Sequence, residues 1–454
     1  MLRLQARLSA NVARLCPEEQ AARRPVPEAP SVEPRADAAA EHVRQTGAMT
    51  GAGPEKLETS HTVGRAITLV MAIGCGVVVA AVYSNQPMLG IMEAAFPGYV
   101  WITDLVPMAT QIGFAVGLLL LVPLGDRVDR RSLILLQLTA FAFSLAAAAL
   151  APDARALVVI SALVGITSSV AQQIVPFAAE LAEPSRRGAT IGTVMSGLLC
   201  GMLLGRVVAG SVADHYGWRA MYWLSLLLVT ATGCLLAATL PQGQAKTHAG
   251  YGELLKSLIA LWRDEPALRR ATMIQACLFG SFTAFWTILA LQLRARYHLG
   301  AETAGLFGIA GVVGILFAPI AGKFADRRGP ADLIAAGAFI MLASWLAFAA
   351  VGTVAGLIAG VILLDFGEQA ALVSNQQVIY ALRPEARNRL NTIFMGGMFV
   401  GGAIGSAEAV LVWHMAGWYA VCALGTALVA IAMAHAWNAA GLTARMFSRA
   451  RKAA

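Results

Sequence analysis

The amino-acid sequence predicts an all-α membrane protein of twelve transmembrane helices, arranged as two pseudo-symmetric six-helix bundles. Three observations support this fold class. Of the 454 residues, 58% are hydrophobic and only 13% are charged, which is about half the charged fraction of a soluble domain. The apolar residues gather in runs of about twenty, the length that crosses the hydrocarbon core of a bilayer. The third observation is an internal repeat at a spacing of 200 residues.

Apolar windows bounded by charges and turn residues place the predicted spans. Six of them precede a polar stretch and six follow it. The predicted spans are 66–91, 104–124, 132–150, 156–181, 190–213, 218–240, 271–293, 303–322, 331–350, 354–380, 390–413 and 416–437.

The same pattern divides the chain into five parts. The first, 1–62, is rich in Ala, Pro, Glu and Arg and is expected to be a disordered cytosolic tail. A short basic helix on the membrane surface at 2–15 is the alternative for its beginning. The other parts are an N-terminal bundle at 63–240, a cytosolic linker at 241–270, a C-terminal bundle at 271–440 and a basic cytosolic tail at 441–454.

Lysine and arginine concentrate in one set of loops between the predicted spans. The opposite loops contain only Arg155, Arg219, Arg294 and Arg296. Because basic loops stay in the cytoplasm, this asymmetry predicts a multi-pass membrane protein with both termini in the cytoplasm. The basic set comprises Arg127, Arg130, Arg131, Arg186, Arg187, Lys246, Lys256, Arg263, Arg269, Arg270, Lys323, Arg327, Arg328, Arg383, Arg387 and Arg389, with four more in the tail.

A shift of 200 residues aligns the two halves without a gap. Glycines alone could match by chance in such a chain, but charged loops and Gly-Trp pairs match at the same shift. A duplicated six-span unit is the plan of transporters that bind their solute between the halves. The aligned pairs include Asp126–Arg127 with Asp326–Arg327, Gly201 with Gly401, Gly205 with Gly405, and Gly217–Trp218 with Gly417–Trp418.

The loop after the eighth predicted span carries the motif Gly-x-x-x-Asp-Arg-x-Gly, which residues 322–329 (GKFADRRG) match. On this motif and the repeat, the chain resembles the major facilitator superfamily over about 66–440. The first copy of the motif has Val122 and Asp129 in place of its two glycines.

The resemblance implies that this motif belongs to a gate on the cytosolic side. One carboxylate and several guanidinium groups in a short loop can form charge-assisted hydrogen bonds in one conformer and break them in another. The alternative is that these arginines only set the topology. The gate candidates are Asp126, Arg127, Arg130, Asp326 and Arg327.

Two further segments resemble branches of the same superfamily. Residues 201–210 (GMLLGRVVAG) are similar to the Gly-x-x-x-Gly-Pro-x-x-Gly-Gly pattern of drug and metabolite antiporters, with Arg206 where the pattern has Pro. Ser161 stands about where those antiporters carry an arginine. Residues 83–87 (YSNQP) are similar to the Tyr-Asn-Gln-Pro stretch of arabinose-efflux-like permeases. Generic helix packing is the alternative for the small residues.

Four ionisable residues fall inside predicted spans: Arg206, Asp365, Glu368 and Glu408. A charge at mid-bilayer costs about 2.5–3.5 kcal/mol, so it is kept there for a partner or a function. Asp365 and Glu368 are three residues apart and therefore share a helix face. Two carboxyl groups so close in an apolar medium favour the binding of a proton, as proton coupling requires. Asp365, Glu368 and Glu408 are the coupling candidates, and structural ion pairs are the alternative.

Polar and aromatic residues in the predicted spans suggest a cavity for a mixed apolar and polar solute. In the superfamily, spans one and seven face this cavity, and the 200-residue shift places Phe285 and Trp286 opposite Asn85 and Gln86. Ordinary packing is the alternative for each aromatic residue. The cavity candidates are Asn85, Gln86, Gln172, Gln173, Arg206, Gln275, Phe282, Phe285, Trp286 and Gln376.

The sequence contains no catalytic constellation and no phosphate-binding Gly-x-x-x-x-Gly-Lys-Ser/Thr loop. We therefore expect no enzyme, no cofactor, no metal and no nucleic acid, but a monomer in the lipid bilayer that takes a small-molecule substrate. The leading hypothesis is a secondary active transporter that exports a small organic solute (drug, sugar or metabolite) in exchange for protons. A symporter or uniporter that imports a metabolite is the alternative, and a non-transporting receptor on the same fold is a remote one.

Overall fold

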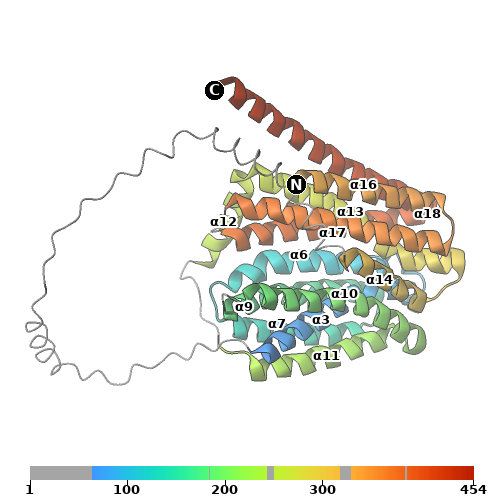
Figure 1. The fold of residues 1–454 in the computed structure, drawn as a ribbon. Coiled ribbons are helices and arrows are strands. Elements are labelled where there is room, and N and C mark those ends of the chain that lie inside the picture. The colour runs from blue at the N-terminus through green and yellow to red at the C-terminus, as the bar shows by residue number, and fades with distance from the viewer. Residues whose placement is uncertain (1–63, 184, 243–249, 317–328, 384–385, 454) are drawn as a thin grey trace, which may run out of the picture. The chain divides into compact units, whose positions relative to one another are not determined.

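The computed structural model describes residues 64–183, 185–242, 250–316, 329–383 and 386–453. Every regular element within these ranges is an α-helix, and the long helices run side by side (Figure 1). The helices before residue 241 are α3 (Arg65–Tyr83), α4 (Asn85–Ala95), α5 (Val100–Thr103), α6 (Val106–Leu124), α7 (Arg130–Ala149), α8 (Ala154–Ser168), α9 (Ala171–Leu181), α10 (Arg187–Tyr216) and α11 (Trp218–Thr239).

The remaining helices repeat this arrangement after one additional helix in the linker. They are α12 (Tyr251–Asp264), α13 (Pro266–Tyr297), α14 (Ala301–Leu316), α16 (Pro330–Ala350), α17 (Val354–Leu382) and α18 (Arg387–Ala453).

Ten helical segments of the described chain are long and apolar enough to cross a membrane. One of them, Arg387–Trp437, bends at Gly417 and contains two of the predicted spans. The eighth predicted span begins with α14, and its end at 317–322 lies outside the described residues. The predicted fold class is thus confirmed, with twelve spans in two related sets.

The two related sets pack their first and fifth spans in the same way. A Cβ atom at Gly201 of α10 would lie 2.1 Å from the carbonyl oxygen of Gly76 on α3, and one at Gly401 of α18 would lie 2.3 Å from that of Ala276 on α13. The two partners, Gly76 and Ala276, are related by the same shift of 200 residues as the two glycines. Glycine is required here because the helix backbones touch directly.

A second duplicated feature begins the last span of each half. Gly217 has φ 81° and ψ 159°, and Gly417 has φ 70° and ψ −156°. This region of backbone space is essentially restricted to glycine. The two Gly-Trp pairs, 200 residues apart, therefore encode the same sharp turn twice.

The helix α12 lies within the predicted linker, for which the sequence pattern indicated no helix. It packs against α6 and α18, and the Tyr251 hydroxyl donates a hydrogen bond to Leu120 O at 2.7 Å. Glu265, just after α12, pairs with Arg383 at 2.6 Å. The linker thus contacts both halves at the arginine-rich end of the bundle.

Alanine at Gly201 or Gly401 should destabilise the fold by about 1–3 kcal/mol, because the added methyl group would force two helix backbones apart. Thermal unfolding of the detergent-solubilised protein, followed by tryptophan fluorescence, measures this loss. Gly192→Ala on the same α10 is the matched control, since a Cβ there meets nothing within 4 Å. Equal melting temperatures for Gly201→Ala and Gly192→Ala would contradict the proposed contact.

Candidate functional site

The interior of the bundle contains a buried arginine whose partners come from both halves. Arg206 of α10 is 1% exposed, and its Nε donates to Gln86 Oε1 of α4 at 3.2 Å. Its guanidinium carbon lies 3.8 Å from the ring centroid of Trp286 on α13 and 5.0 Å from that of Tyr83. These aromatic faces stabilise the buried cation. Arg206 Nη2 has no hydrogen-bond partner among the described residues.

Two carboxyl groups of α17 are buried close to this arginine. A Cβ atom added at Gly311 of α14 would lie 3.1 Å from Asp365 Oδ1. A Cβ atom added at Gly308, one turn earlier, would lie 3.4 Å from Arg206 Cβ. The two glycines let both side chains approach α14, and Arg206 and Asp365 interact electrostatically. Asp365 Oδ2 and Glu368 Oε2 have no hydrogen-bond partner within the described ranges.

Glu368 is held by an amide pair on its other side. The Gln275 Nε2 donates to Glu368 Oε1 at 2.6 Å, and Asn375 Nδ2 donates to Gln275 Oε1 at 3.0 Å. Together with Arg206, the two carboxyl groups carry one net negative charge when both are ionised and none when one holds a proton. Burial of an uncompensated charge is costly, so the number of protons on this cluster affects the interaction between the halves.

The predicted aromatic residues lie in two different environments. Trp286 faces Arg206, whereas Phe285 stacks on Phe348 of α16 with ring centroids 4.4 Å apart. Phe282 is also buried, and Asn85 donates to Thr110 Oγ1 at 2.9 Å. These side chains are therefore packed in the interior and are not among the residues that line the cavity described next.

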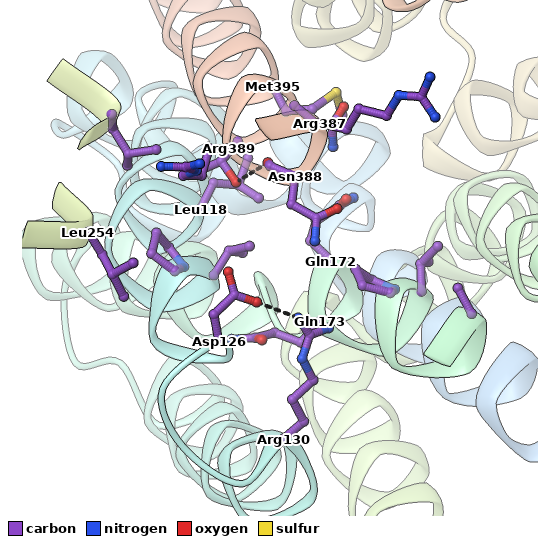
Figure 2. Close-up of a pocket in the computed structure, with 18 of the residues that line it drawn as sticks. Leu118, Asp126, Arg130, Gln172, Gln173, Leu254, Arg387, Asn388, Arg389 and Met395 are labelled. Atoms are coloured by element: carbon purple, nitrogen blue, oxygen red, sulfur yellow. Dashed lines mark hydrogen bonds and ion pairs between the residues drawn. The ribbon is translucent and has the colours of Figure 1, made fainter. Parts of the chain in front are cut away.

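A cavity of about 380 Å³ separates the two halves at the arginine-rich end. Gln172 and Gln173 of α9 border it on one side, and Asn388 and Met395 of α18 on the other (Figure 2). Gln173 Nε2 also donates to Leu121 O at 2.7 Å. Of the predicted cavity residues, Gln172 and Gln173 line this cavity, while Gln376 reaches its edge through Met395 Sδ at 3.9 Å.

The gate candidates border the same cavity through a buried arginine. Arg130 is 4% exposed and pairs with Asp126 at 2.7 Å and with Glu180 of α9 at 3.0 Å. Its Nε donates to Gly125 O at 3.1 Å. Arg127 is exposed and lies outside this set. Asp326 and Arg327 lie outside the described residues.

Asp129 explains the altered first copy of the loop motif. Its carboxylate accepts from the backbone N–H groups of Arg131 at 3.2 Å and Ser132 at 2.9 Å, and thus caps α7. The third coupling candidate, Glu408, is half-buried on α18 and lies near Cys277 of α13.

The opposite end of the bundle is closed by contacts between the halves. Asp214 at the end of α10 accepts from the backbone N–H groups of Ala301 at 3.1 Å and Glu302 at 2.6 Å, which are the first turn of α14. Arg294 of α13 donates to Gly90 O of α4. The halves therefore touch at this end and stand apart at the arginine-rich end.

Several of these residues were not predicted. Glu180 and Tyr83 were absent from the candidate sets although each contacts one of their members. Glu180 is a charge at a span end, where solvation is the usual explanation. Its role depends on the position of α9 beside α7, which cannot be predicted from the local sequence pattern.

A helical bundle of two related halves, with buried charged groups and a cavity between them, is the architecture of a membrane transporter. The family model of the Major Facilitator Superfamily matches residues 71–367 and 271–440, so the chain belongs to this family. It is a multi-pass membrane transporter for a small molecule and not an enzyme.

Curated relatives cover nearly the full length of the described bundle. YgaY of Escherichia coli, an uncharacterized transporter, is 37% identical over 381 residues, which are 84% of this chain and 97% of YgaY. SCO4007 of Streptomyces coelicolor, a "probable transporter", is 32% identical over 409 residues, 88% of this chain and 91% of that protein.

Solved structures share the fold at low sequence identity. A D-xylose-proton symporter aligns with a TM-score of 0.64 at 16% identity, covering 81% of this chain and 96% of that one. The human organic anion transporter MFSD10 aligns with a TM-score of 0.62 at 16% identity, covering 82% and 100%. These likenesses concern the fold alone.

Arg130→Gln should lower the stability by about 1.5–3 kcal/mol, because it removes charge-assisted hydrogen bonds and leaves two carboxylates beside each other. Arg127→Gln, three residues earlier and exposed, should change it by less than about 0.5 kcal/mol. Thermal unfolding of the two variants in the same detergent makes the comparison. An equal loss of stability in both variants would contradict the importance assigned to the Arg130 ion pairs.

Proposed function

We propose that this transporter exports a small organic solute in exchange for protons, by alternating access. The observation that carries the proposal is the buried set of Arg206, Asp365 and Glu368. One cation faces two carboxyl groups, so their protonation changes the net charge between the halves. A group whose protonation alters an interdomain interaction can couple a proton gradient to a conformational change.

The cycle would use Arg206 as the common partner. With a proton on Asp365, the cation relies on Gln86 and the Trp286 face. When the proton leaves, the attraction between Arg206 and Asp365 increases, and the two halves are drawn together at mid-bundle. A solute that competes for Arg206 or for these carboxyl groups would thereby exchange with the proton.

The orientation of the chain supports an inward-facing conformer. Because Lys and Arg concentrate at the end with the 380 Å³ cavity, we assign this end to the cytoplasm, with both termini on the same side of an inner membrane. The solute would enter between Gln172 and Asn388. Arg130, Asp126 and Glu180 would then form the cytosolic gate, with Asp326 and Arg327 as the expected counterparts in the second half.

The transported solute is expected to have an apolar part and a polar part. The cavity wall combines amides and charged groups with Leu118, Val122 and Met395. Such a wall suits molecules with an apolar body and a few hydrogen-bonding groups. We propose a monomer as the functional unit, since the cavity and both ends are completed within one chain.

Asp365→Asn should abolish proton-driven transport while leaving solute exchange between equal concentrations intact. The asparagine keeps the shape of the side chain but cannot carry a proton, so the conformational change no longer requires the gradient. Proteoliposomes with a controlled pH difference, assayed with radiolabelled arabinose, chloramphenicol and ethidium, measure both activities. Asp332→Asn, at an exposed carboxylate of α16, is the matched control and should retain coupling.

Three outcomes would distinguish the alternatives. Solute movement with the same sign as proton movement would replace the antiporter with a symporter. Movement that is unaffected by a protonophore and by Asp365→Asn would indicate a uniporter. Binding without any movement would favour the receptor hypothesis.

A further inference from the structure

The closed end of the bundle contains a cluster of metal-ligating side chains that the transport mechanism does not use. Glu93 of α4, Asp104 just after α5 and His414 of α18 each place one potential ligand atom within 4.8 Å of the others. His414 Nε2 lies 2.7 Å from Asp104 Oδ2. Two of the ligands come from the first half and one from the second, 310 residues further along the chain.

Asp104 has unused bonding capacity inside this cluster. Its side chain is 0% exposed, and no N–H donor among the described residues reaches its Oδ1, whose carboxyl neighbour is Glu93. Glu93 brings a second carboxylate, which accepts but does not donate hydrogen bonds when ionised. A buried carboxylate oxygen without a partner costs more than the free energy of an ordinary lost hydrogen bond. A cation between the two carboxylates would remove this cost.

Two basic side chains lie near the cluster, and one of them, Arg294, interacts electrostatically with Glu93. Arg294 and His298 of α13 and the segment after it line the same outer cavity as Glu93 and His414. Arg294 donates to the Gly90 carbonyl, so at least one of its hydrogen bonds is directed to the backbone. The cavity measures about 720 Å³ and leads from the surface to Glu93 and His414. It thus provides a path by which an ion could enter.

We propose that Glu93, Asp104 and His414 bind a divalent transition-metal ion, with Zn²⁺ as the best match. One imidazole nitrogen and two carboxylate oxygens, with a fourth position open to water, form a ligand set that Zn²⁺ accepts. Mg²⁺ and Ca²⁺ prefer sites made of oxygen alone, and Cu⁺ prefers sulfur. The imidazole therefore discriminates among the common cations.

Such an ion would join the two halves at the closed end. Its ligands lie on α4 and beside α5 in one half and on α18 in the other, so the three can meet only while this end is shut. A ligand that binds one conformer more tightly shifts the population toward it. The metal ion would thereby favour the conformer with the arginine-rich end open. The binding itself does not depend on the direction of transport or on its coupling to protons.

The experiment is a calorimetric titration of ZnCl₂ into the full-length protein, purified with a tag that contains no histidine. The protein is first treated with a chelator, and its thiols are blocked with N-ethylmaleimide because Cys200 and Cys234 are exposed. We expect one Zn²⁺ per chain, with an affinity at least about tenfold lower in His414→Gln and Asp104→Asn. Millimolar MgCl₂ should not compete. His298→Gln, from the same cavity, is the matched control and should change the affinity by less than about twofold.

Trp101 supplies a second measurement that separates binding from misfolding. Its ring lies 4.2 Å from the His414 ring and is half exposed. Zn²⁺ should therefore change the tryptophan emission of the wild-type protein, and Trp101→Phe should lose this change while it retains the calorimetric binding. The buried Asp104→Asn variant is accepted only if its elution volume and melting temperature stay close to those of the wild-type protein.

Two results would overturn the proposal. One is the absence of stoichiometric Zn²⁺ binding by the wild-type protein, which would mean that a proton shared by Glu93 and Asp104 is sufficient to hold the cluster. The other is unchanged Zn²⁺ affinity in a well-folded His414→Gln variant. Neither result bears on the solute exchange tested with Asp365→Asn, so the two proposals can fail separately.

Discussion

Arg206 is a buried cation in the interior of a membrane bundle, and groups from both halves surround it. Tyr83 and Gln86 belong to the first half, whereas Trp286 and Asp365 belong to the second. Because an unpaired charge inside a membrane protein is costly, a rearrangement of the halves must keep or replace these contacts. The position of one guanidinium group thus limits which motions the bundle can make.

The close packing inside each half makes such motions collective. The glycine contacts between spans one and five bring helix backbones together, so these spans cannot slide apart without losing dense packing. The same contact recurs in the second half. We therefore expect each half to move as a unit, with the changes at the surfaces between them. This is the physical basis for treating the arginine-rich cavity and the opposite closed end as two alternatives of one motion.

The two ends of the bundle use different chemistry. At the arginine-rich end, Arg130 joins α7 to α9 within one half, and the halves are separated by a cavity. At the other end, Asp214 caps α14 across the halves, and His414 meets Asp104. In the proposed cycle, the contacts between the halves form and break, so their protonation and ligation are effective control points.

The sequence by itself determined the twelve spans, their division into two related halves and the proximity of Asp365 to Glu368. These features depend on hydropathy, on a constant shift of 200 residues and on helical spacing. All three can be found along the chain without knowing which helices pack together. The tertiary structure alone decided that Arg206 faces Trp286, that Arg130 pairs with Glu180 and that Asp104 meets His414. Such pairs depend on the rotation and tilt of each helix against its neighbours, because a side chain finds a distant partner only after the helices have packed.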